Sequence, residues 1–456
     1  MPTRQKLIIL AVGIGFIAIV AFIGCQRNNS VSSFTLTFDP LVGGIISLKR
    51  SNDVFDTEYI KKGNMLGDVM IRYRTQNSEW RKIAIAEMQD NYTVDVLSKT
   101  EYKVVYSIGD ELELIKHLVL EDENLIWIMR FQNNTDQRIE IGDIALQLKM
   151  NTDFVAGSVM DEEAVRLTYQ NRLNKHRFIA GHGSFIYWMR ANGVGPYLVM
   201  TPLRDTKLEY FDRYYVAYIN SAYTGGNETR GTWRQKHTST ILEPKGKEGD
   251  SANFGFRFAW GQDYDGVRDV LYNNGAFDIN VIPGMTLPNN LYAKFSLRTK
   301  NNIQSVIPEY PDFTEIEYLG EKDKDVHIYK VKFSKLGENL LTINYNKNSL
   351  LILEFFCTEP LETLYRKRAK FIAEKQQHYN DKWYNGLYSL WDMNNKVLLG
   401  PENRGGLHQF QVEGADDPCT GKPVFLSEKN VAHPDPQEIT ALEYFIVTTQ
   451  ASKVRF

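Results

Sequence analysis

Carboxyl groups that could act as acid and base occur close together near the end of this sequence. Asp416 and Asp417 are adjacent, and Glu428 follows shortly after them. Glycoside hydrolysis uses two carboxyl groups, about 5–5.5 Å apart in retaining enzymes and about 6.5–9.5 Å apart in inverting ones. We therefore predict Asp416, Asp417 and Glu428 as candidate catalytic residues. The alternative is structural: Asp-Asp-Pro is a common turn, and Glu428 beside Lys429 is then a solvated surface residue.

The segment that surrounds these carboxylates also contains the residue types that bind sugars. Sugar rings stack on aromatic faces, and sugar hydroxyls bond to carboxylates, amides and Arg. Glycines such as Gly405 and Gly406 supply a flexible backbone between them. We predict six substrate-binding residues: Trp383, Trp391, Asp392, Glu402, Arg404 and His408. The alternative for His408 is packing within a polar loop, since it lacks a partner at metal-ligand spacing.

Several other functions are excluded by missing motifs. The sequence contains no GxSxG, no GxxxxGK[ST] and no HExxH motif, and it has no CxxC pair that could hold zinc. We therefore expect no metal site and no cofactor. Lys and Arg number 53 against 56 Asp and Glu, for a net charge of -3. This balance argues against a nucleic-acid partner, which would normally require a basic excess.

The N-terminus predicts export. Arg4 and Lys6 precede an uncharged stretch from Leu7 to Gly24, and Cys25 follows at once. The tetrapeptide Phe-Ile-Gly-Cys resembles the lipobox of bacterial lipoproteins, although Phe and Ile replace the usual Leu and small residue. We expect residues 1–25 to be a lipoprotein-type signal, with Cys25 lipidated and the remaining chain at the cell envelope, periplasmic or on the cell surface. The alternatives are an uncleaved anchor, because such a stretch nearly spans a bilayer of about 30 Å, and a freely secreted form.

The elements that must position these residues are mostly strands. From Phe34 onward the apolar residues recur with a period of two, and turn residues separate the runs. Residues 30–357 therefore predict one very large antiparallel sandwich, or two packed side by side. Tyr264–Asn273 is the one helical interruption that we expect. Cys357 and Cys419 could pair in an oxidising compartment, but their spacing leaves this open.

The pattern then changes to a helical period. Apolar residues from Pro360 to Asp381 recur at helical spacing, with Pro360 in the first turn, and predict a linker helix over 358–382. Residues 382–436 are rich in Gly and Pro and predict loops. The last helical signal starts at Pro436, with Asp435 as its N-cap and Glu438 beside the positive end of the helix dipole.

Four segments carry a resemblance to a known family: Tyr272–Gly275, Met285–Leu291, Gly386–Asp392 and Glu428–Pro434. Together they resemble the six-hairpin glycosidase-like proteins of polysaccharide-degrading bacteria and fungi. The strand run Leu125–Leu148, with its Asn-Asn-Thr turn, is similar to the β-supersandwich of carbohydrate-active enzymes. The resemblance covers most of residues 34 to 447 and implies glycan cleavage, by hydrolysis or by elimination. It carries no assignment of site residues.

The resemblance also implies a domain order. A mainly β fold with a galactose-mutarotase-like β-supersandwich over 30–357 would be followed by the linker helix and, over 383–456, by the first part of an (α/α)6 toroid. Such a toroid has twelve helices, which at about 11–12 residues each need several hundred residues with their loops. Only about one barrel helix precedes Phe456. We therefore expect either a C-terminally truncated chain or a relative without the toroid.

Three functional hypotheses remain at this point. The first is the N-terminal portion of an exported glycoside hydrolase-like enzyme, which cleaves a polysaccharide or oligosaccharide by carboxylate acid/base catalysis or is inactive as a fragment. Lyase chemistry is the less favoured form of this hypothesis. The second is a non-catalytic glycan-binding surface lipoprotein, and the third is a scaffold fragment without activity.

Overall fold

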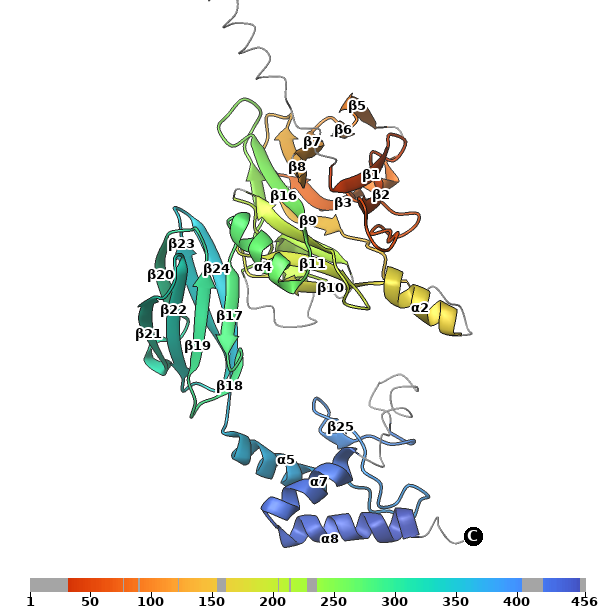
Figure 1. Cartoon of the computed structure of the whole chain (residues 1–456), viewed down its shortest axis with the longest axis vertical. Helices are drawn as coiled ribbons and strands as arrows, with labels where there is room; N and C mark the ends of the chain where they lie inside the picture. Colours follow the sequence, from red (N-terminus) through yellow and green to blue (C-terminus); the bar gives the residue numbers. More distant parts are fainter. Residues whose placement is uncertain are drawn as a thin grey trace, which may run out of the picture. The chain divides into compact units, whose positions relative to one another are not determined.

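The computed structural model describes residues 32–76, 78–88, 91–121, 123–153, 161–203, 205–212, 215–227, 236–403 and 421–451 (Figure 1). Strands contain 47% of the residues and helices contain 19%, so the predicted mainly β class is confirmed. The chain divides into two compact units. Unit 1 consists of Met1–Asp278, Leu297–Val306 and Thr342–Leu353, and unit 2 consists of Ile279–Ser296, Ile307–Leu341 and Glu354–Phe456.

An eight-stranded antiparallel sheet forms one layer of unit 1 (Figure 1). Its strands, in spatial order, are β10 (Leu173–Phe178), β11 (Phe185–Arg190), β12 (Tyr197–Leu203), β16 (Ser251–Gly261), β8 (Asn124–Asn133), β7 (Leu112–Glu121), β6 (Glu101–Ile108) and β5 (Tyr92–Ser98). In β7 every second residue is buried, as the period of a half-buried strand requires. Because β10 and β5 are the first and last strands in this order, they form the two edges of the sheet.

A six-stranded antiparallel sheet forms the opposite layer. Its order is β13 (Tyr210–Phe211), β14 (Val216–Ser221), β9 (Ile139–Gln147), β3 (Val69–Thr75) and β4 (Arg81–Ala84), and β15 (Thr240–Leu242) also pairs with β9. One buried hydrophobic cluster joins the two sheets. Trp127 and Phe256 from the first sheet and Ile71 and Ile141 from the second are fully buried in it. The predicted antiparallel sandwich is thus confirmed for unit 1.

A buried arginine fixes the segment that leaves the hairpin of β1 (Phe34–Asp39) and β2 (Gly44–Arg50). Arg190 is fully buried at the end of β11, where its guanidinium donates to the Thr57 hydroxyl at 2.7 Å and to the Gly195 carbonyl at 2.6 Å, and it pairs with Asp53. A buried charge is tolerated only when paired and hydrogen-bonded. Arg190 therefore holds the chain that leads into Glu58.

Two four-stranded sheets follow in the sequence. One has the order β17 (Asp278–Ile282), β19 (Ala293–Arg298), β22 (Val326–Phe333) and β21 (Thr314–Glu321), and the other has β18 (Thr286–Pro288), β24 (Ser349–Thr358), β23 (Gly337–Tyr345) and β20 (Ile303–Pro308). Phe355 of β24 lies 5.1 Å from Phe333 and 6.2 Å from Phe295, measured between ring centroids. Because these rings join both sheets, the region 30–357 contains two sandwiches rather than one.

The helices of unit 1 include one that the sequence pattern did not predict. α4 (Tyr264–Asn273) begins at Asp263, whose carboxylate accepts from the Gly266 amide, and agrees with the prediction. α2 (Glu162–Asn171) corrects the expectation that no other helix interrupts the strands. It spans ten residues and buries only one of them, Thr168, so it leaves no run of core-facing apolar residues in the sequence. The short elements α3 (Ala222–Asn227), η1 (Ile85–Glu87) and η2 (Pro311–Phe313) complete the connections.

Three helices pack together in unit 2. α5 (Leu361–Lys375) lies within the predicted 358–382 segment, although Pro360 is its N-cap residue and not part of its first turn. α7 (Gly421–Ala432) corrects the prediction that 382–436 is all loop. Leu426 of α7 is fully buried with Ile372 of α5 and Phe445, so packing overrides the loop-like composition. A short hairpin of β25 (Trp391–Asp392) and β26 (Val397–Leu398) precedes α7.

The last α-helix begins as predicted. α8 (Pro436–Phe445) has Asp435 at its N-cap, accepting from the Gln437 and Glu438 amides, and continues into η3 (Ile446–Ala451). Glu438 lies in the first turn of α8, as expected, and its buried carboxylate also accepts from Lys429 at 2.6 Å and Asn430 at 2.9 Å. This ion pair connects α7 to α8.

Some predictions concern residues that the structure does not describe. Cys25 and the rest of residues 1–25 lie outside the described residues, and so does Cys419. Cys357 is buried, with its Sγ 3.5 Å from the Phe333 carbonyl oxygen, so its pairing with Cys419 stays a prediction. In the part of the chain that is described, no helix has the length and apolar character needed to cross a membrane. The further toroid helices also stay a prediction.

A lysine lies on the core face of β7, between two leucines. The Lys116 ammonium is fully buried and donates to the Gly67 carbonyl at 2.8 Å and the Tyr106 hydroxyl at 3.0 Å. Burial lowers its pKa to about 7, and nearby Asp68 opposes this shift in part. The folded pKa lies below the unfolded one, so the unfolded chain binds more protons above neutral pH. Stability therefore rises as the pH increases through this range.

We predict that the free energy of unfolding increases by about 3 kcal/mol between pH 7 and pH 10 because of Lys116, and that Lys116→Met removes this increase. Urea denaturation followed by tryptophan fluorescence at several pH values measures it. Lys99→Met, at an exposed position, is the control and should keep the increase. Parallel pH profiles for the wild type and Lys116→Met would contradict the prediction.

Candidate functional site

A cavity of about 890 Å³ lies beside the edge strand β10 in unit 1, and we call it cavity A. The register that pairs Lys175 with Trp188 places both side chains on the same side of the eight-stranded sheet. Trp188 is buried in the core, whereas Lys175 lies on the last strand and is only half-buried. The lining of cavity A consists of Lys61, Asn64, Leu148, Lys149, Met150, Thr152, Arg172, Leu173, Asn174, Lys175, His176, Trp188 and Tyr215.

Two cations of β10 close the edge of the sandwich next to cavity A. The Lys175 ammonium lies 5.2 Å, and the Arg177 guanidinium carbon 4.9 Å, from the ring centroid of Phe211. Phe211 belongs to β13, the edge strand of the opposite sheet, and is part of the core. Burial and the nearby Arg177 lower the pKa of Lys175, while Asp212 opposes them. Lys175 is thus a partly desolvated cation, which strengthens its interaction with an anion.

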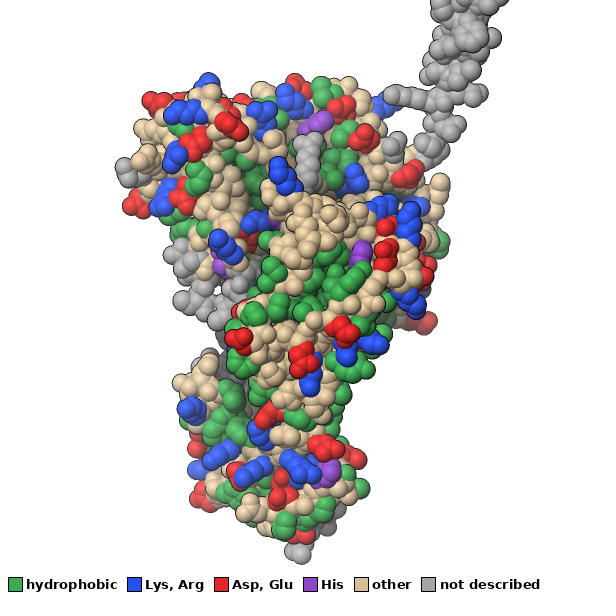
Figure 2. Space-filling model, turned by 90° about the vertical axis from the view of Figure 1, so that its left-hand side faces the viewer, with side chains coloured by type: hydrophobic (Ala, Val, Ile, Leu, Met, Phe, Trp, Pro, Cys, Tyr) green, Lys and Arg blue, Asp and Glu red, His purple; other side chains and the backbone are tan. Residues whose placement is uncertain are grey.

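The charge that lines cavity A has one sign. Among the described residues that line it, four are basic, Lys61, Lys149, Arg172 and Lys175, and none is Asp or Glu. The adjacent carboxylates of Asp153, 2.7 Å from Lys61, and Asp68, 3.8 Å from Lys149, lie outside the lining. Basic and acidic side chains are interspersed over the face shown in Figure 2. The basic lining is therefore a local feature of cavity A and suits a ligand with negative charge.

Aromatic and amide groups complete cavity A. Tyr215 is 39% exposed, and the Lys149 ammonium lies 5.6 Å from its ring centroid. Asn64 and Asn174 can both donate and accept hydrogen bonds. An aromatic ring, amides and cations together can hold a polar ring with hydroxyl and anionic groups. The described lining of cavity A is therefore suited to binding such a ring.

A second cavity, of about 970 Å³, adjoins the first, and we call it cavity B. Its lining is largely apolar but has four carboxylates, Asp39, Glu58, Asp68 and Asp153, against two ammonium groups, Lys62 and Lys149. The other lining residues are Leu41, Val42, Ile46, Ile60, Gly63, Asn64, Met65, Ile85, Ala86, Met88, Tyr92 and Asn151. Asn64 and Lys149 line both cavities, so A and B meet at these two residues.

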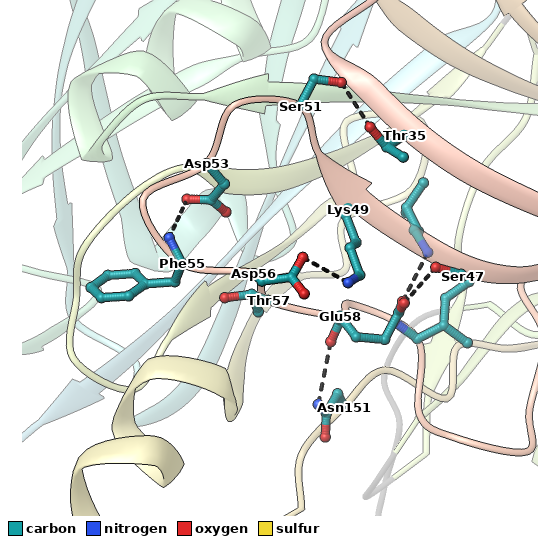
Figure 3. A network of polar contacts seen from close by, with 12 residues as sticks. Thr35, Ser47, Lys49, Ser51, Asp53, Phe55, Asp56, Thr57, Glu58 and Asn151 are labelled. Carbon is teal, nitrogen blue, oxygen red and sulfur yellow. Dashed lines mark hydrogen bonds and ion pairs between the residues drawn. The ribbon is translucent and has the colours of Figure 1, made fainter.

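The carboxylate of Glu58 is held by protein donors (Figure 3). One oxygen accepts from the Ser47 hydroxyl at 2.6 Å, and the other accepts from the Leu48 and Ile60 amides at 2.8 and 3.0 Å. Asn151 donates to the Glu58 carbonyl oxygen at 3.3 Å. Glu58 therefore has a structural role in connecting β2 to the wall of cavity B.

Most of the residues predicted from the sequence as a site lie outside the described residues or on the surface of unit 2. Asp416, Asp417, Arg404 and His408 are not described. Glu428 is exposed on α7. Because the structure describes only one of the three predicted carboxylates, no separation between them can be compared with those of glycosidases, and their catalytic role stays a prediction.

The predicted sugar-binding residues that are described have individual contacts. Trp383 is 72% exposed, with its ring 5.4 Å from that of Tyr384. The Trp391 ring lies 5.7 Å from that of Phe371 on α5. A carboxylate oxygen of Glu402 lies 3.7 Å from the Lys382 ammonium nitrogen. Among these residues, exposed Trp383 presents the largest aromatic surface for stacking.

Asp392 stabilises the turn between β25 and β26. Its carboxylate accepts from the Asn395 side chain at 2.6 Å and from the Asn394 amide at 2.9 Å. The hydrogen bonds from Asn395 lower its pKa. These contacts give Asp392 a turn-forming role, whether or not it also contacts a ligand.

The residues of cavity A were not recognised from the sequence. They come from strand ends and connections that are far apart in the chain, such as Lys61, Lys149 and Lys175. A weak signal was present in Lys175-His176-Arg177, where three basic residues occupy an edge strand. No group of three or more His, Cys, Asp or Glu within the described ranges could hold a metal ion.

Comparisons with known proteins concern the fold. The model of a family of unknown function, DUF5695, matches residues 50–456. No curated protein matches the sequence. A solved polysaccharide lyase is 14% identical and has a TM-score of 0.70, covering 91% of this chain and 59% of the lyase. This chain thus spans less than two thirds of the lyase's length, and at such low identity the similarity shows the fold alone.

Two weaker structural similarities also involve carbohydrate-active enzymes. The GH36 α-galactosidase AgaA of Geobacillus stearothermophilus is 11% identical, with a TM-score of 0.30 over 57% of this chain and 44% of the enzyme. A 4-α-glucanotransferase from Thermococcus litoralis is 11% identical, with a TM-score of 0.24 over 50% of this chain and 38% of that enzyme. These scores are too low to carry an argument about this chain.

Proposed function

The chain belongs to DUF5695, a family of unknown function, and we propose that it is a carbohydrate-active protein that binds a polysaccharide or oligosaccharide in cavity A. The observation that carries this proposal is the lining of cavity A, which combines an aromatic ring, amides and four cations in about 890 Å³. Glycan sites use such a combination of stacking and hydrogen bonding. The fold shared with a polysaccharide lyase supports the same class of ligand.

Hydrolysis of a glycan by residues of unit 2 is the second part of the proposal. In it, Asp416, Asp417 and Glu428 supply the acid and the base or nucleophile, and Trp383, Trp391, Asp392, Glu402, Arg404 and His408 contact the sugar. The similarity of Gly386–Asp392 and Glu428–Pro434 to six-hairpin glycosidase-like proteins and the exposure of Glu428 support it. Non-catalytic glycan binding is the alternative, and the cations, amides and aromatic ring that line cavity A support it.

Export and lipid anchoring through Cys25 are the third part. The basic residues before the uncharged stretch and the cysteine directly after it support this location. A protein at the cell envelope would meet polysaccharides outside the cytoplasm.

We predict that glycan binding depends on the cations of cavity A. An array of acidic and neutral glycans identifies a ligand for the full chain, and titration calorimetry then measures its affinity. The double variant Lys149→Met and Lys175→Met should weaken binding about tenfold or more, because it removes two charge-assisted hydrogen bonds. Tyr215→Ala should weaken binding severalfold through lost stacking.

The control for this experiment is Lys247→Met, at an exposed position outside both cavities, which should bind like the wild type. The proposal is wrong if no glycan on the array binds, or if the double variant retains the wild-type affinity.

We predict that, if the bound glycan is cleaved, cleavage requires the carboxylates of unit 2. Asp417→Asn and Glu428→Gln should abolish the release of reducing sugar while leaving calorimetric affinity unchanged, since an amide cannot exchange the proton. An unsaturated product that absorbs in the ultraviolet would indicate elimination instead. Release that persists in all three single variants, with Asp416→Asn as the third, would remove these residues from the mechanism.

We predict that Cys25 anchors the protein to the membrane. The wild-type chain should partition into the detergent phase after cell fractionation, and Cys25→Ser should move to the soluble fraction because it cannot be lipidated. Retention of Cys25→Ser in the membrane would favour an uncleaved hydrophobic anchor.

A further inference from the structure

Cavities A and B differ in charge although they adjoin. Cavity A has four basic side chains and no acidic one in its lining, whereas cavity B has four carboxylates and two ammonium groups among apolar side chains. Asn64 and Lys149 belong to both linings. A ligand that extends from A into B therefore passes from a basic to an acidic and apolar environment at these two residues.

Asp68 in cavity B is held by fewer protein hydrogen bonds than the neighbouring Glu58: a backbone hydrogen bond from Ala86 acts on its carboxyl, whereas the Glu58 carboxylate accepts three. The Asp68 residue is 6% exposed, and its Oδ1 has no hydrogen-bond partner among the described residues. Its Oδ2 lies 3.8 Å from the Lys149 ammonium, a distance beyond a hydrogen bond. A buried polar atom without a partner costs about 1–3 kcal/mol. Asp68 lines cavity B, so its carboxyl borders the space that a ligand would occupy, although Oδ1 itself is enclosed.

The environment of Asp68 favours a hydroxyl over an anion as its partner. Burial raises the pKa of the Asp68 carboxyl, although Lys149 and Lys116 oppose this effect. In either protonation state the carboxyl can accept a hydrogen bond from a sugar hydroxyl. An anionic group placed in cavity B would instead approach the carboxylate of Glu58 among others, which is unfavourable at short range.

We infer that cavities A and B are consecutive subsites for one acidic glycan, with an anionic sugar in A and the adjoining neutral sugar in B, where Asp68 bonds to a sugar hydroxyl. This inference rests on the proposed glycan binding and specifies the ligand. The basic side chains of A, including Lys175, neutralise the carboxylate or sulfate of the first sugar. The apolar wall of B, which includes Met88, covers the face of the second sugar.

The test compares three tetrasaccharides by titration calorimetry with the full chain. One alternates uronic acid and neutral hexose, one contains only uronic acid, and one contains only neutral hexose. The alternating tetrasaccharide should bind about tenfold more tightly than the pure uronate, and the neutral one should bind most weakly. Lys175→Met should weaken the binding of both acidic tetrasaccharides.

Variants in cavity B test the second subsite. Asp68→Leu should reduce the tenfold preference for the alternating tetrasaccharide to less than twofold without weakening the pure uronate, because it removes the hydroxyl partner. Asp68→Asn should retain most of the preference, since an amide also donates and accepts. Met88→Ala, at a partly buried position, should reduce the preference about threefold and covers the case in which Asp68→Leu does not fold. Lys247→Met is again the control.

The outcomes separate this inference from the proposed function. If the acidic tetrasaccharides bind, but the pure uronate binds as tightly as the alternating one, the inference is wrong and glycan binding stands. The same holds if both Asp68→Leu and Met88→Ala leave the preference unchanged. If none of the three tetrasaccharides binds, while the array experiment also finds no ligand, the proposed function fails and the inference fails with it.

Discussion

The contact between two cations and Phe211 determines how the sandwich of unit 1 ends. Two packed sheets leave an open edge, where core side chains would meet solvent. At this edge Lys175 and Arg177 of β10 lie over the ring of Phe211 in β13, at 5.2 and 4.9 Å. Long basic side chains suit such a position, because their stems cover apolar surface while their charges reach water. The core is thereby closed, and a basic cavity lies beside the closure.

The polar groups near the two cavities differ in how many hydrogen bonds they make within the protein. The Arg190 guanidinium donates to several protein oxygens, and the Glu58 carboxylate accepts from several protein donors. These bonds fix the connection between β2 and the cavities. Asp68 has an oxygen without a partner, close to the cavity wall. A satisfied buried network rigidifies a structure, whereas an unsatisfied atom is a cost that a ligand can offset. We therefore assign a structural role to Arg190 and Glu58 and a ligand-binding role to Asp68.

The sequence predicted the features that depend on local pattern. The period of two along β7, the helix α4 and the Asp435 cap of α8 follow from residues that are adjacent or one turn apart. α7 was missed because its stability depends on Leu426 packing against α5, a contact between distant segments. Cavity A was missed for the same reason, since Lys61 and Lys175 come together only through strand pairing. The predicted carboxylates Asp416 and Asp417 lie outside the described residues.

The central claim is that unit 1 binds an acidic glycan at the edge closed by Lys175 and Phe211. A crystal structure of the full chain with a bound alternating uronate–hexose tetrasaccharide tests this claim most directly. We predict an anionic group of the sugar within hydrogen-bond distance of the Lys149 or Lys175 ammonium, and a hydroxyl of the adjoining sugar within about 3.2 Å of an oxygen of the Asp68 carboxyl, the usual range for such bonds. Sugar density confined to the Trp383–Trp391 segment of unit 2, with both cavities empty, would contradict it.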